Sequence, residues 1–435
     1  MKKMYKLIAS AAFIGSMVFT TNINAQWTAM GAGISSGEVY TLQGFGSDVI
    51  VGGGYFSPYT DVAIWNGSSY SSAGFTPTQG LLAMAAFDSV VYIATYNAIY
   101  QHIGSSTIQI ATLNDPCYAL CFWNHKLYAG GWMNTINSVK LGYLDQYDPT
   151  TATWDSIPVE VDSWPKAMCV YNGQLAVAGY MNYTSAGDTL YGVGLWNGTK
   201  WTPLNKGIKG SGGVYAITTL GPDLYIGGQF DSASTAYKYG PHVFTNNIAV
   251  WNGTTWDSVG SQKTGGPSST VYALTTFNGG VVAGGYFDSI PSWNGSVWSQ
   301  LGNVTLTTMT AEVNAFTVLS GNLYAGGFFD HVGGIAASNV AEFTKPTAVN
   351  EVNNNENIRV YPNPSNGVFT IESLAGSRQS SVEIYNVLGE KVLEQLSILN
   401  SQFSINLSNQ PAGIYVYRIL SQDGSFISSG KMVKQ

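Results

Sequence analysis

The side chains that could perform chemistry in this chain are few and far apart. One pattern typical of a serine nucleophile, GxSxG, occurs at residues 33–37. A nucleophile of this kind requires a strand-to-helix turn, and no helical periodicity follows Gly37, so we interpret the match as a result of the abundant glycine and serine. The histidines show no HExxH or paired-ligand spacing; they are His102, His125, His242 and His331. The sequence therefore predicts no catalytic residue, no metal site and no cofactor.

Four segments of the form WNG[ST] satisfy the N-x-[ST] rule for sugar attachment. Their acceptor residues are Asn66, Asn197, Asn252 and Asn294. The same Asn-Gly pairs suit the positive φ angles of a tight hairpin turn. Turn geometry explains these segments without a sugar, and we interpret the acceptor pattern as incidental.

The elements that must position any site are predicted to be strands. The chain has 435 residues, of which 51 are glycine, 13% are aromatic and only 10% are charged. This composition is too apolar for a disordered chain, and the abundance of Val, Thr, Tyr and Trp favours strands joined by tight turns. We predict an all-β protein. The net charge of −7, with no basic stripe, argues against nucleic acid as a partner.

The N-terminal segment has the pattern of a secretory signal peptide. Three lysines precede an apolar run from Leu7 to Thr20, and we expect residues 1–25 to be removed by cleavage between Ala25 and Gln26. The run is shorter than the ~20 residues that span a bilayer, so no transmembrane segment is expected in the mature chain.

A repeated unit fills residues 26–345. Upstream of each WNG segment, a strand pattern such as VYALTTF (271–277) is followed by a turn and a strand that ends in paired small residues, such as VVAGGYF (281–287). Seven copies recur about every 45 residues, the period of four-stranded propeller blades. Glycine weakens a strand interior unless a side chain or backbone approaches closely. We expect packed aromatic side chains of neighbouring sheets to be that group.

A di-glycine followed by aromatic residues resembles the repeat of Kelch-type propellers. Residues 144–154, LDQYDPTTATW, are similar to the YDPxTxxW segment of that family. The resemblance implies a seven-bladed β-propeller and no particular activity. The last copy stops at residue 343 without a fourth strand, whereas QWTAMG at residues 26–31 has the pattern of that strand. We therefore predict that Trp27 completes the seventh blade and hides a sheet edge.

The cysteines do not form a disulfide framework. Cys117 and Cys121 lie four residues apart in one predicted strand, about 13 Å along it, which is too far for a bond. Cys121 and Cys169 occupy the same place in successive repeats, so a disulfide bond between them is an alternative. Buried free thiols are the interpretation we favour.

The last part of the chain reads as a separate β-domain. After an Asn-rich linker (346–357), residues 358–435 alternate short strands with Pro, Asn and Gly turns, which predicts a small Ig-like β-sandwich. The motifs YPNP, IYNVLGEKV, PAGIY and KMVK closely resemble the type A C-terminal sorting domain of the type IX secretion system. The residues that carry this resemblance are Tyr361, Pro362, Asn363, Pro364, Gly413, Tyr415, Lys431 and Lys434.

This resemblance implies a Bacteroidota-type export route with the type IX secretion machinery as partner. The protein would pass through the periplasm and then be released or attached to the outer-membrane surface. An ordinary Ig-like adhesion module is the alternative.

Six triplets resemble the Asp-[Ser/Thr]-apolar O-glycosylation motif of the same bacterial group. Their hydroxyl residues are Ser89, Ser156, Thr189, Ser232, Ser258 and Ser289. This number exceeds chance for the composition, but repetition of the blade also raises it. Either O-glycosylation or the repetition of the blade could explain why these triplets recur.

A ligand site is predicted on the face that carries the long insertions. One insertion, residues 232–246, holds several aromatic residues, and the residues predicted to contact ligand are Tyr237, Tyr239, His242 and Phe244. In propellers such loops share one face with the connections between blades, and that face usually holds the ligand. The same residues could instead pack the loop onto the body.

Taken together, these patterns predict a secreted or cell-surface, non-enzymatic binding protein whose propeller presents a loop face to a glycan or protein ligand. The alternative is a secreted glycan-active enzyme of the lyase or oxidase type on a Kelch-like propeller. An enzyme would require a cluster of His, Tyr, Cys or acidic side chains at the ring centre or on the loop face.

Overall fold

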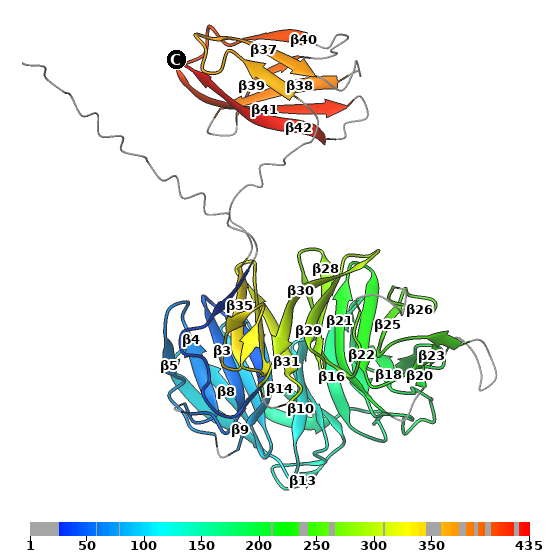
Figure 1. Ribbon diagram of the computed structural model, residues 1–435. Coiled ribbons are helices and arrows are strands. Elements are labelled where there is room, and N and C mark those ends of the chain that lie inside the picture. Colours follow the sequence, from blue (N-terminus) through cyan, green and yellow to red (C-terminus); the bar gives the residue numbers. More distant parts are fainter. Residues whose placement is uncertain are drawn as a thin grey trace, which may run out of the picture. The chain divides into compact units, whose positions relative to one another are not determined.

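A computed structural model describes most of the chain after residue 25. The described residues are 26–57, 59–77, 79–209, 212–234, 242–260, 266–307, 309–344, 358–373, 380–386, 390–395, 402–421 and 426–435. The predicted signal peptide (1–25) and linker (346–357) lie outside them. The chain divides into two compact units, one within residues 24–345 and one within residues 346–435. Both contain strands and, among the described residues, no helix (Figure 1).

The first unit repeats one construction in seven antiparallel sheets. Each begins with a long strand that pairs with a second strand ending in small residues. The first three sheets are formed by β2 (Glu38–Phe45), β3 (Asp48–Gly54), β4 (Val62–Trp65) and β5 (Tyr70–Ser72); by β6 (Leu81–Phe87), β7 (Val90–Thr95), β8 (Ala98–Ile103) and β9 (Ser106–Thr112); and by β10 (Cys117–Trp123), β11 (Lys126–Gly131), β14 (Leu144–Asp148) and β15 (Thr153–Ser156).

The other four sheets follow the same order. They are formed by β16 (Pro165–Tyr171), β17 (Gln174–Gly179), β18 (Val193–Trp196) and β19 (Trp201–Pro203); by β21 (Val214–Leu220), β22 (Asp223–Gly228), β25 (Ile248–Trp251) and β26 (Trp256–Ser258); by β27 (Val271–Phe277), β28 (Gly280–Gly285), β29 (Ser289–Trp293) and β30 (Trp298–Thr305), which β33 (His331–Val332) and β34 (Ile335–Ala336) extend; and by β31 (Glu312–Leu319), β32 (Asn322–Phe328), β35 (Val340–Thr344) and β1 (Gln26–Ala29).

Short strands lie in the insertions between second and third strands. They are β12 (Thr135–Ile136) and β13 (Val139–Lys140), and β23 (Ser232–Ser234) and β24 (His242–Phe244). β20 (Ile208–Lys209), in the connection from β19 to β21, pairs with β23.

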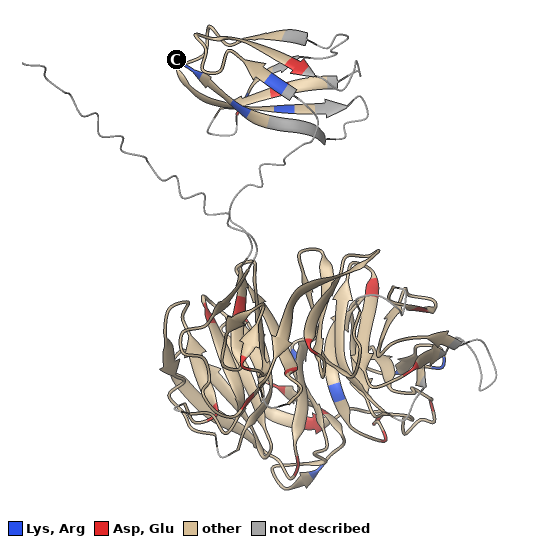
Figure 2. Ribbon diagram, viewed as in Figure 1, with Lys and Arg blue, Asp and Glu red and all other residues tan. Residues whose placement is uncertain are grey.

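The first strands of the seven sheets contact one another in a cycle. β2 contacts β6, and the contacts continue through β10, β16, β21, β27 and β31, which in turn contacts β2. This order gives the unit a propeller-like arrangement with the first strands innermost. Charged residues are sparse along these strands (Figure 2), in agreement with their low share of the sequence.

The N-terminal strand joins the last sheet, as the sequence predicted. β1 pairs antiparallel with β35, and Trp27 lies opposite Phe343. Trp27 is only 4% exposed, and its ring centroid lies 5.1 Å from that of Phe343. The prediction that residues around Trp27 supply the missing fourth strand is therefore confirmed.

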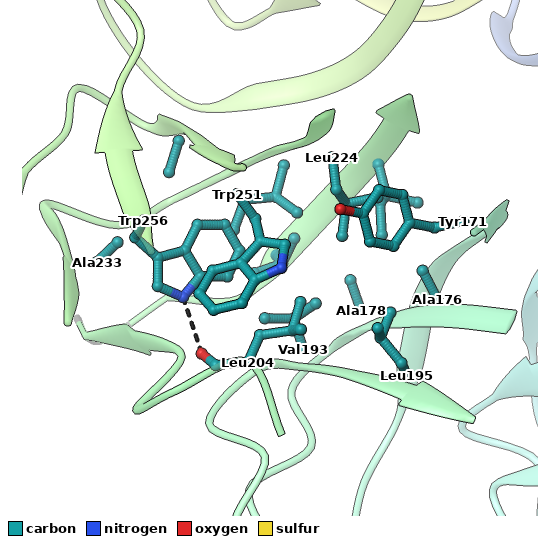
Figure 3. Close-up of a cluster of buried hydrophobic side chains, with 14 of the residues drawn as sticks. Tyr171, Ala176, Ala178, Val193, Leu195, Leu204, Leu224, Ala233, Trp251 and Trp256 are labelled. Atoms are coloured by element: carbon teal, nitrogen blue, oxygen red, sulfur yellow. Dashed lines mark hydrogen bonds between the residues drawn. The ribbon is translucent and has the colours of Figure 1, made fainter. Parts of the chain in front are cut away.

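The tryptophans of the WNG hairpins are core residues that tie neighbouring sheets together. Trp251 and Trp256 pack with their ring centroids 5.3 Å apart, and the Trp256 Nε1 donates to the Leu204 carbonyl of the preceding sheet at 2.9 Å (Figure 3). At the turn between them, the Asn252 Oδ1 accepts hydrogen bonds from two backbone amides, and Gly253 has a φ of +96°. The Asn-Gly pair is thus explained by the turn, which supports our interpretation of the acceptor pattern as incidental.

The second unit consists of two antiparallel sheets. One contains β36 (Ile358–Tyr361), β37 (Val368–Ser373) and β40 (Gln402–Asn406); the other contains β39 (Lys391–Gln395), β38 (Ser380–Asn386), β41 (Gly413–Ser421) and β42 (Phe426–Lys434). Residues of both sheets share one buried cluster, which includes Phe369, Ile371, Ile384 and Met432. An Ig-like topology for this unit stays a prediction.

Candidate functional site

A β-bulge occurs at the same place in the first strand of all seven sheets. Each bulge leaves one residue of the first strand without a direct partner on the second strand. A bulge changes the direction of the side chain at that position, and bulges are common next to functional sites. We call these residues the bulge ring: Tyr40, Leu82, Tyr118, Lys166, Tyr215, Tyr272 and Asn314.

The paired glycines of the second strand make room for this bulge and for the next sheet. A Cβ on Gly228 would lie 2.2 Å from the carbonyl oxygen of Gly213, just before the first strand of its own sheet. A Cβ on Gly227 would lie 2.4 Å from a methyl group of Val271 in the following sheet. The expectation that aromatic side chains provide the close approach is therefore corrected: the nearest groups here are a backbone carbonyl and an aliphatic side chain.

The bulge ring lines a cavity of about 460 Å³ at the centre of the inner strands. The wall of the cavity also includes the residue two positions further along each first strand, which is apolar in every sheet: Leu42, Met84, Leu120, Met168, Ile217, Leu274 and Phe316. The cavity therefore combines tyrosine hydroxyls, one amide and one ammonium group with an apolar surface. Such a mixture is typical of sites that bind small molecules.

A chain of aromatic rings leads from the exposed surface into this cavity. Trp132 stacks on Trp164 with ring centroids 4.7 Å apart, and Trp164 lies 5.2 Å from Tyr180. The Tyr180 hydroxyl is 2.8 Å from the Tyr215 hydroxyl, and the Tyr215 ring lies 6.0 Å from that of Tyr272. We call these five residues the aromatic arc. Trp132 is 47% exposed, whereas Tyr215 and Tyr272 line the cavity.

Lys166 is the cationic member of the bulge ring. Its Nζ lies 3.1 Å from the centroid of the Tyr118 ring, and burial lowers the pKa of its ammonium group to about 8. Among the described residues, no carboxylate forms an ion pair with Lys166. The ammonium group of Lys166 is therefore a partly desolvated cation in the wall of the cavity. The contact described for it is the face of the Tyr118 ring.

Two glutamates form an acid pair on the other side of the ring. Glu38 begins β2 and Glu312 begins β31, and the Asn314 Nδ2 donates to a Glu38 carboxylate oxygen at 2.7 Å. Burial, and then the neighbouring charge of Glu38, raise the pKa of Glu312 above its ordinary value. In the cycle of contacts, two sheets separate Lys166 from the acid pair in either direction. The ring is therefore electrically polarised.

The predicted ligand residues lie apart from this cavity or outside the described residues. Tyr237 and Tyr239 are not among the described residues, and His242 belongs to β24 without a described side chain. Phe244, in the same strand, is 69% exposed and does not line the cavity. The prediction for these four residues stays untested.

The cavity is lined by other residues, which the sequence patterns did not single out. Two features of the sequence could have indicated this site. Several first strands have a tyrosine as their second residue, and in several second strands an aromatic residue directly follows the paired small residues. The latter residues are Tyr96, Trp132, Tyr180, Tyr286 and Phe328. They begin the connection between the second and third strands, so they lie at the end of the strands where ligand binding was predicted.

The other candidates for chemistry have ordinary structural partners. In the GxSxG segment, the Ser35 hydroxyl donates to the Ser57 carbonyl at 3.0 Å. His102 is buried beside the Thr107 hydroxyl, and His331 contacts Asp330, both at 2.8 Å. Among the described residues, no group of three or more His, Cys, Asp and Glu side chains could hold a metal ion. The described part of the chain also lacks a helix with the length and hydropathy of a membrane span.

All three cysteines are free thiols, so the alternative of a disulfide bond between Cys121 and Cys169 is wrong. Burial raises the pKa of each of Cys117, Cys121 and Cys169 to about 12. The thiols are therefore packing groups, which agrees with the favoured interpretation.

The Asp-[Ser/Thr]-apolar triplets have a structural role in the sheets. In five of the six, the apolar third residue is buried: Ile157, Leu190, Ala233, Val259 and Ile290. Core packing thus explains why the triplet recurs. Of the six hydroxyl residues, Ser89 is exposed in the turn between β6 and β7, whereas Ser232 is buried. Modification of Ser89, Ser156, Thr189, Ser232, Ser258 or Ser289 stays a prediction.

In the second unit, several residues of the predicted sorting motif meet at the C-terminal strand. The Asn363 amide group donates to the Lys431 carbonyl at 2.7 Å and accepts from the Val433 amide at 2.8 Å. The Lys434 ammonium donates to the Ser408 carbonyl at 3.0 Å. The YPNP segment is thereby joined to the end of the chain.

Comparison with known proteins identifies this second unit. Residues 359–435 match the family described as the secretion system C-terminal sorting domain. A search of curated proteins finds no match for the chain.

Solved structures with a similar fold include PorZ, described as an essential bacterial surface component of the type-IX secretion system of Porphyromonas gingivalis, at 14% identity and a TM-score of 0.48. The match covers 92% of this chain and 60% of that one, so this chain spans about 60% of the length of that relative. The WD40 β-propeller of Doa1 matches at 14% identity over 73% of this chain and 98% of its own, with a TM-score of 0.49. The WD40 domain of Neurospora crassa Pan2 matches at 10% identity over 73% and 91%, with a TM-score of 0.43.

The sorting-domain match indicates secretion by the type IX system to the cell surface or the extracellular space. It also implies an interaction of the second unit with the type IX machinery.

Proposed function

We propose that this chain is a secreted or surface-displayed binding protein whose first unit is a seven-bladed, Kelch-like β-propeller. The cyclic contacts of the first strands and the pairing of β1 with β35 support this assignment. Residues 1–25 act as the signal peptide, residues 346–357 as the linker and residues 358–435 as the sorting domain. The ligand site is the cavity lined by the bulge ring together with the aromatic arc.

The observation that carries the binding function is the continuity of the aromatic arc from Trp132 at the surface to Tyr272 in the cavity. The C–H faces of sugar rings stack on indole and phenol rings, and tyrosine hydroxyls can donate to and accept from sugar hydroxyls. The end of a glycan chain is a ligand that can both stack on these rings and form hydrogen bonds with the tyrosine hydroxyls.

The size of the cavity favours a glycan over a protein ligand. A volume of about 460 Å³ lies within the range of small-molecule sites. A stable protein interface needs about 800 Å² on each partner, most of which would have to come from surface outside this cavity. The terminal sugars of a chain could enter the cavity, and the next sugars would lie along Trp164 and Trp132.

Binding also fits the chemistry of the site better than catalysis does. The described histidine side chains, those of His102, His125 and His331, do not line the cavity. Burial raises the pKa of Tyr40 and Tyr272, which removes these phenols further from the range of a general base at neutral pH. The tyrosines therefore serve as neutral hydrogen-bonding and stacking groups.

A glycan-array screen of the chain from Gln26 to Gln435 tests this function. The Trp132→Ala variant should lose most of its array signal, because the substitution removes the exposed end of the aromatic arc. Phe244→Ala is the matched control, since it removes an exposed aromatic ring outside the cavity. A signal that Phe244→Ala abolishes and Trp132→Ala leaves unchanged would move the site to the β23–β24 hairpin. If the chain binds a protein partner and none of the glycans on the array, the proposal of a glycan ligand is rejected.

A further inference from the structure

We infer that the ligand of the bulge ring is an acidic sugar whose carboxylate or sulfate group binds Lys166. This inference rests on the proposed function, and it adds the charge and the orientation of the ligand.

The first argument is the unusual character of Lys166 within its ring. The same bulge position holds tyrosine in four sheets, leucine in one and asparagine in one. Lys166 thus places a charge where no other bulge does, and its side chain lines the cavity. Removing an ammonium group from water is unfavourable unless an anion or hydrogen-bond acceptors replace the water. An anionic ligand would supply that partner.

The second argument is the neutrality of titratable groups on the strands beside Lys166. The ring that its ammonium group contacts belongs to Tyr118 on β10, and burial raises the pKa of that phenol. Cys121 on β10, Cys169 on β16 and Tyr180, which follows β17, also have their pKa raised by burial, so they are uncharged at neutral pH.

The nearest formal charges belong to residues outside the bulge ring. Asp115 precedes β10, and its charge contributes to the raised pKa of Tyr118. Asp162 precedes β16 and accepts from the Asn182 amide, and Lys126 lies at the end of β11 that pairs with Trp123, away from the bulge. No described carboxylate is paired with Lys166 itself.

The third argument is the position of the acid pair. Glu38 and Glu312 belong to sheets separated from that of Lys166 by two sheets on either side. An anion held near the acid pair would be repelled, so the acidic group of a ligand should face Lys166. The hydroxyl groups on the other side of the sugar would then donate to the tyrosine oxygens of the cavity. The cavity thereby fixes both the charge and the orientation of the ligand.

This site should lose its preference for anions at alkaline pH. The pKa of Lys166 is lowered to about 8 by burial, so the free site carries its positive charge below that pH and loses it above. A bound anion favours the ammonium form and raises this pKa. Affinity for the acidic sugar should therefore fall as the pH rises above about 8, whereas affinity for a neutral sugar should not follow this change.

Titration calorimetry with three matched probes tests the inference on the chain from Gln26 to Gln435. The probes are tetragalacturonate, its fully methyl-esterified neutral form and a sulfated galactan tetrasaccharide. We expect one of the two anionic probes to bind about tenfold or more tightly than the neutral ester. The probe that does so distinguishes a carboxylate from a sulfate.

Three variants assign this preference to one side chain. Lys166→Gln should lose it, so that it binds the anionic probe no more tightly than the neutral ester, and Lys166→Arg should keep it. Lys140→Gln, which removes an exposed charge on β13, should also keep it. Circular dichroism and a thermal melt confirm that Lys166→Gln is folded.

Two results would overturn the inference and leave the proposed function intact: equal binding of anionic and neutral probes, or a preference that survives Lys166→Gln. If none of the three probes binds but Trp132-dependent binding to other neutral glycans occurs, the acidic sugar is rejected and the glycan site is kept. If no glycan binds, both proposals fail.

Discussion

The indole Nε1 of Trp27 donates a hydrogen bond of 3.0 Å to the carbonyl of Leu301, which lies 274 residues further along the chain. The same bond recurs between successive sheets, from Trp154 to Ile110 and from Trp256 to Leu204. Trp27 makes it from the opposite end of the sequence, in the one sheet of the first unit whose fourth strand comes from the N-terminus. The stability of the ring should therefore depend on this residue.

Trp27→Ala should lower the free energy of unfolding of the first unit by about 3–5 kcal/mol, because it removes a buried aromatic side chain and an inter-sheet hydrogen bond. Urea denaturation followed by circular dichroism measures the change. Gln26→Ala, at an exposed position of the same strand, is the control and should be neutral. Equal midpoints for Trp27→Ala and the unmodified chain would show that β1 does not close the ring.

Gly228→Ala should destabilise the fold and disturb the ligand site together. Its Cβ would lie 2.2 Å from the Gly213 carbonyl, so the bulge at Tyr215 must shift, at a cost of about 1–3 kcal/mol. Gly44→Ala is the control, because the nearest atoms to its Cβ would be side-chain atoms of Leu319 at 3.3 Å and Thr317 at 3.4 Å. Thermal melts and glycan binding measure the two effects. Loss of stability without loss of binding would separate the bulge from the site.

The bulges show which part of the architecture can be predicted from the sequence and which part cannot. The strand order, the Asn-Gly turns and the closing strand at Trp27 follow from repetition and turn chemistry, which are local signals. The di-glycine also predicted a close approach. It did not reveal that the approaching group is a backbone carbonyl, because the same residues fit a regular strand in which Tyr215 and Ile217 alternate with Ala216.

The candidate site could not be predicted for a related reason. Tyr118, Lys166 and Tyr215 are far apart in sequence and look like ordinary strand residues, and only the cyclic packing of the sheets brings them to one cavity. The predicted site at Tyr237, Tyr239, His242 and Phe244 used loop length and aromatic content instead. Those features predict a loop face for the ligand, and this prediction stays untested.

Stability should depend on pH through Asp145, a fully buried carboxyl group on β14. Burial raises its pKa from 3.8 to about 7, although the Gly142 amide donates to one carboxyl oxygen at 3.0 Å. Between these pH values the folded protein holds a proton that the unfolded chain has released. The stabilising contribution is therefore complete below about pH 4 and is lost as the pH rises through about 7.

Asp145→Asn should accordingly raise the free energy of unfolding at pH 8, on the order of 3 kcal/mol, relative to the unmodified chain. The two proteins should differ much less at pH 4, because the carboxyl group is then protonated in both states. Urea denaturation at the two pH values measures this difference. Asp155→Asn, at an exposed position of β15, is the control. A stabilisation of equal size at pH 4 and pH 8 would contradict the assigned cause.

Sugar attachment at the Asp-[Ser/Thr]-apolar triplets should follow exposure. Ser89 lies exposed in the β6–β7 turn, whereas Ser232 is buried and its hydroxyl donates to Asp231 at 3.0 Å. If the folded protein is modified, Ser89→Ala should remove one mass increment from the native secreted protein and Ser232→Ala should remove none. Intact-mass measurement tests this, and a protein without any hexose-type increment would end the glycosylation hypothesis.

Export should depend on the side chain of Asn363, which joins the YPNP segment to the terminal strand β42. Its amide group satisfies the Lys431 carbonyl and the Val433 amide at once, at 2.7 and 2.8 Å. Asn363→Ala leaves both backbone groups without this partner and should loosen the end of the strand, so the protein should accumulate in the periplasm. Val368→Thr, at an exposed position of β37, is the control and should be exported normally. Cell fractionation with immunoblotting measures the distribution. Normal export of Asn363→Ala would show that this junction is not part of the signal that the type IX machinery recognises.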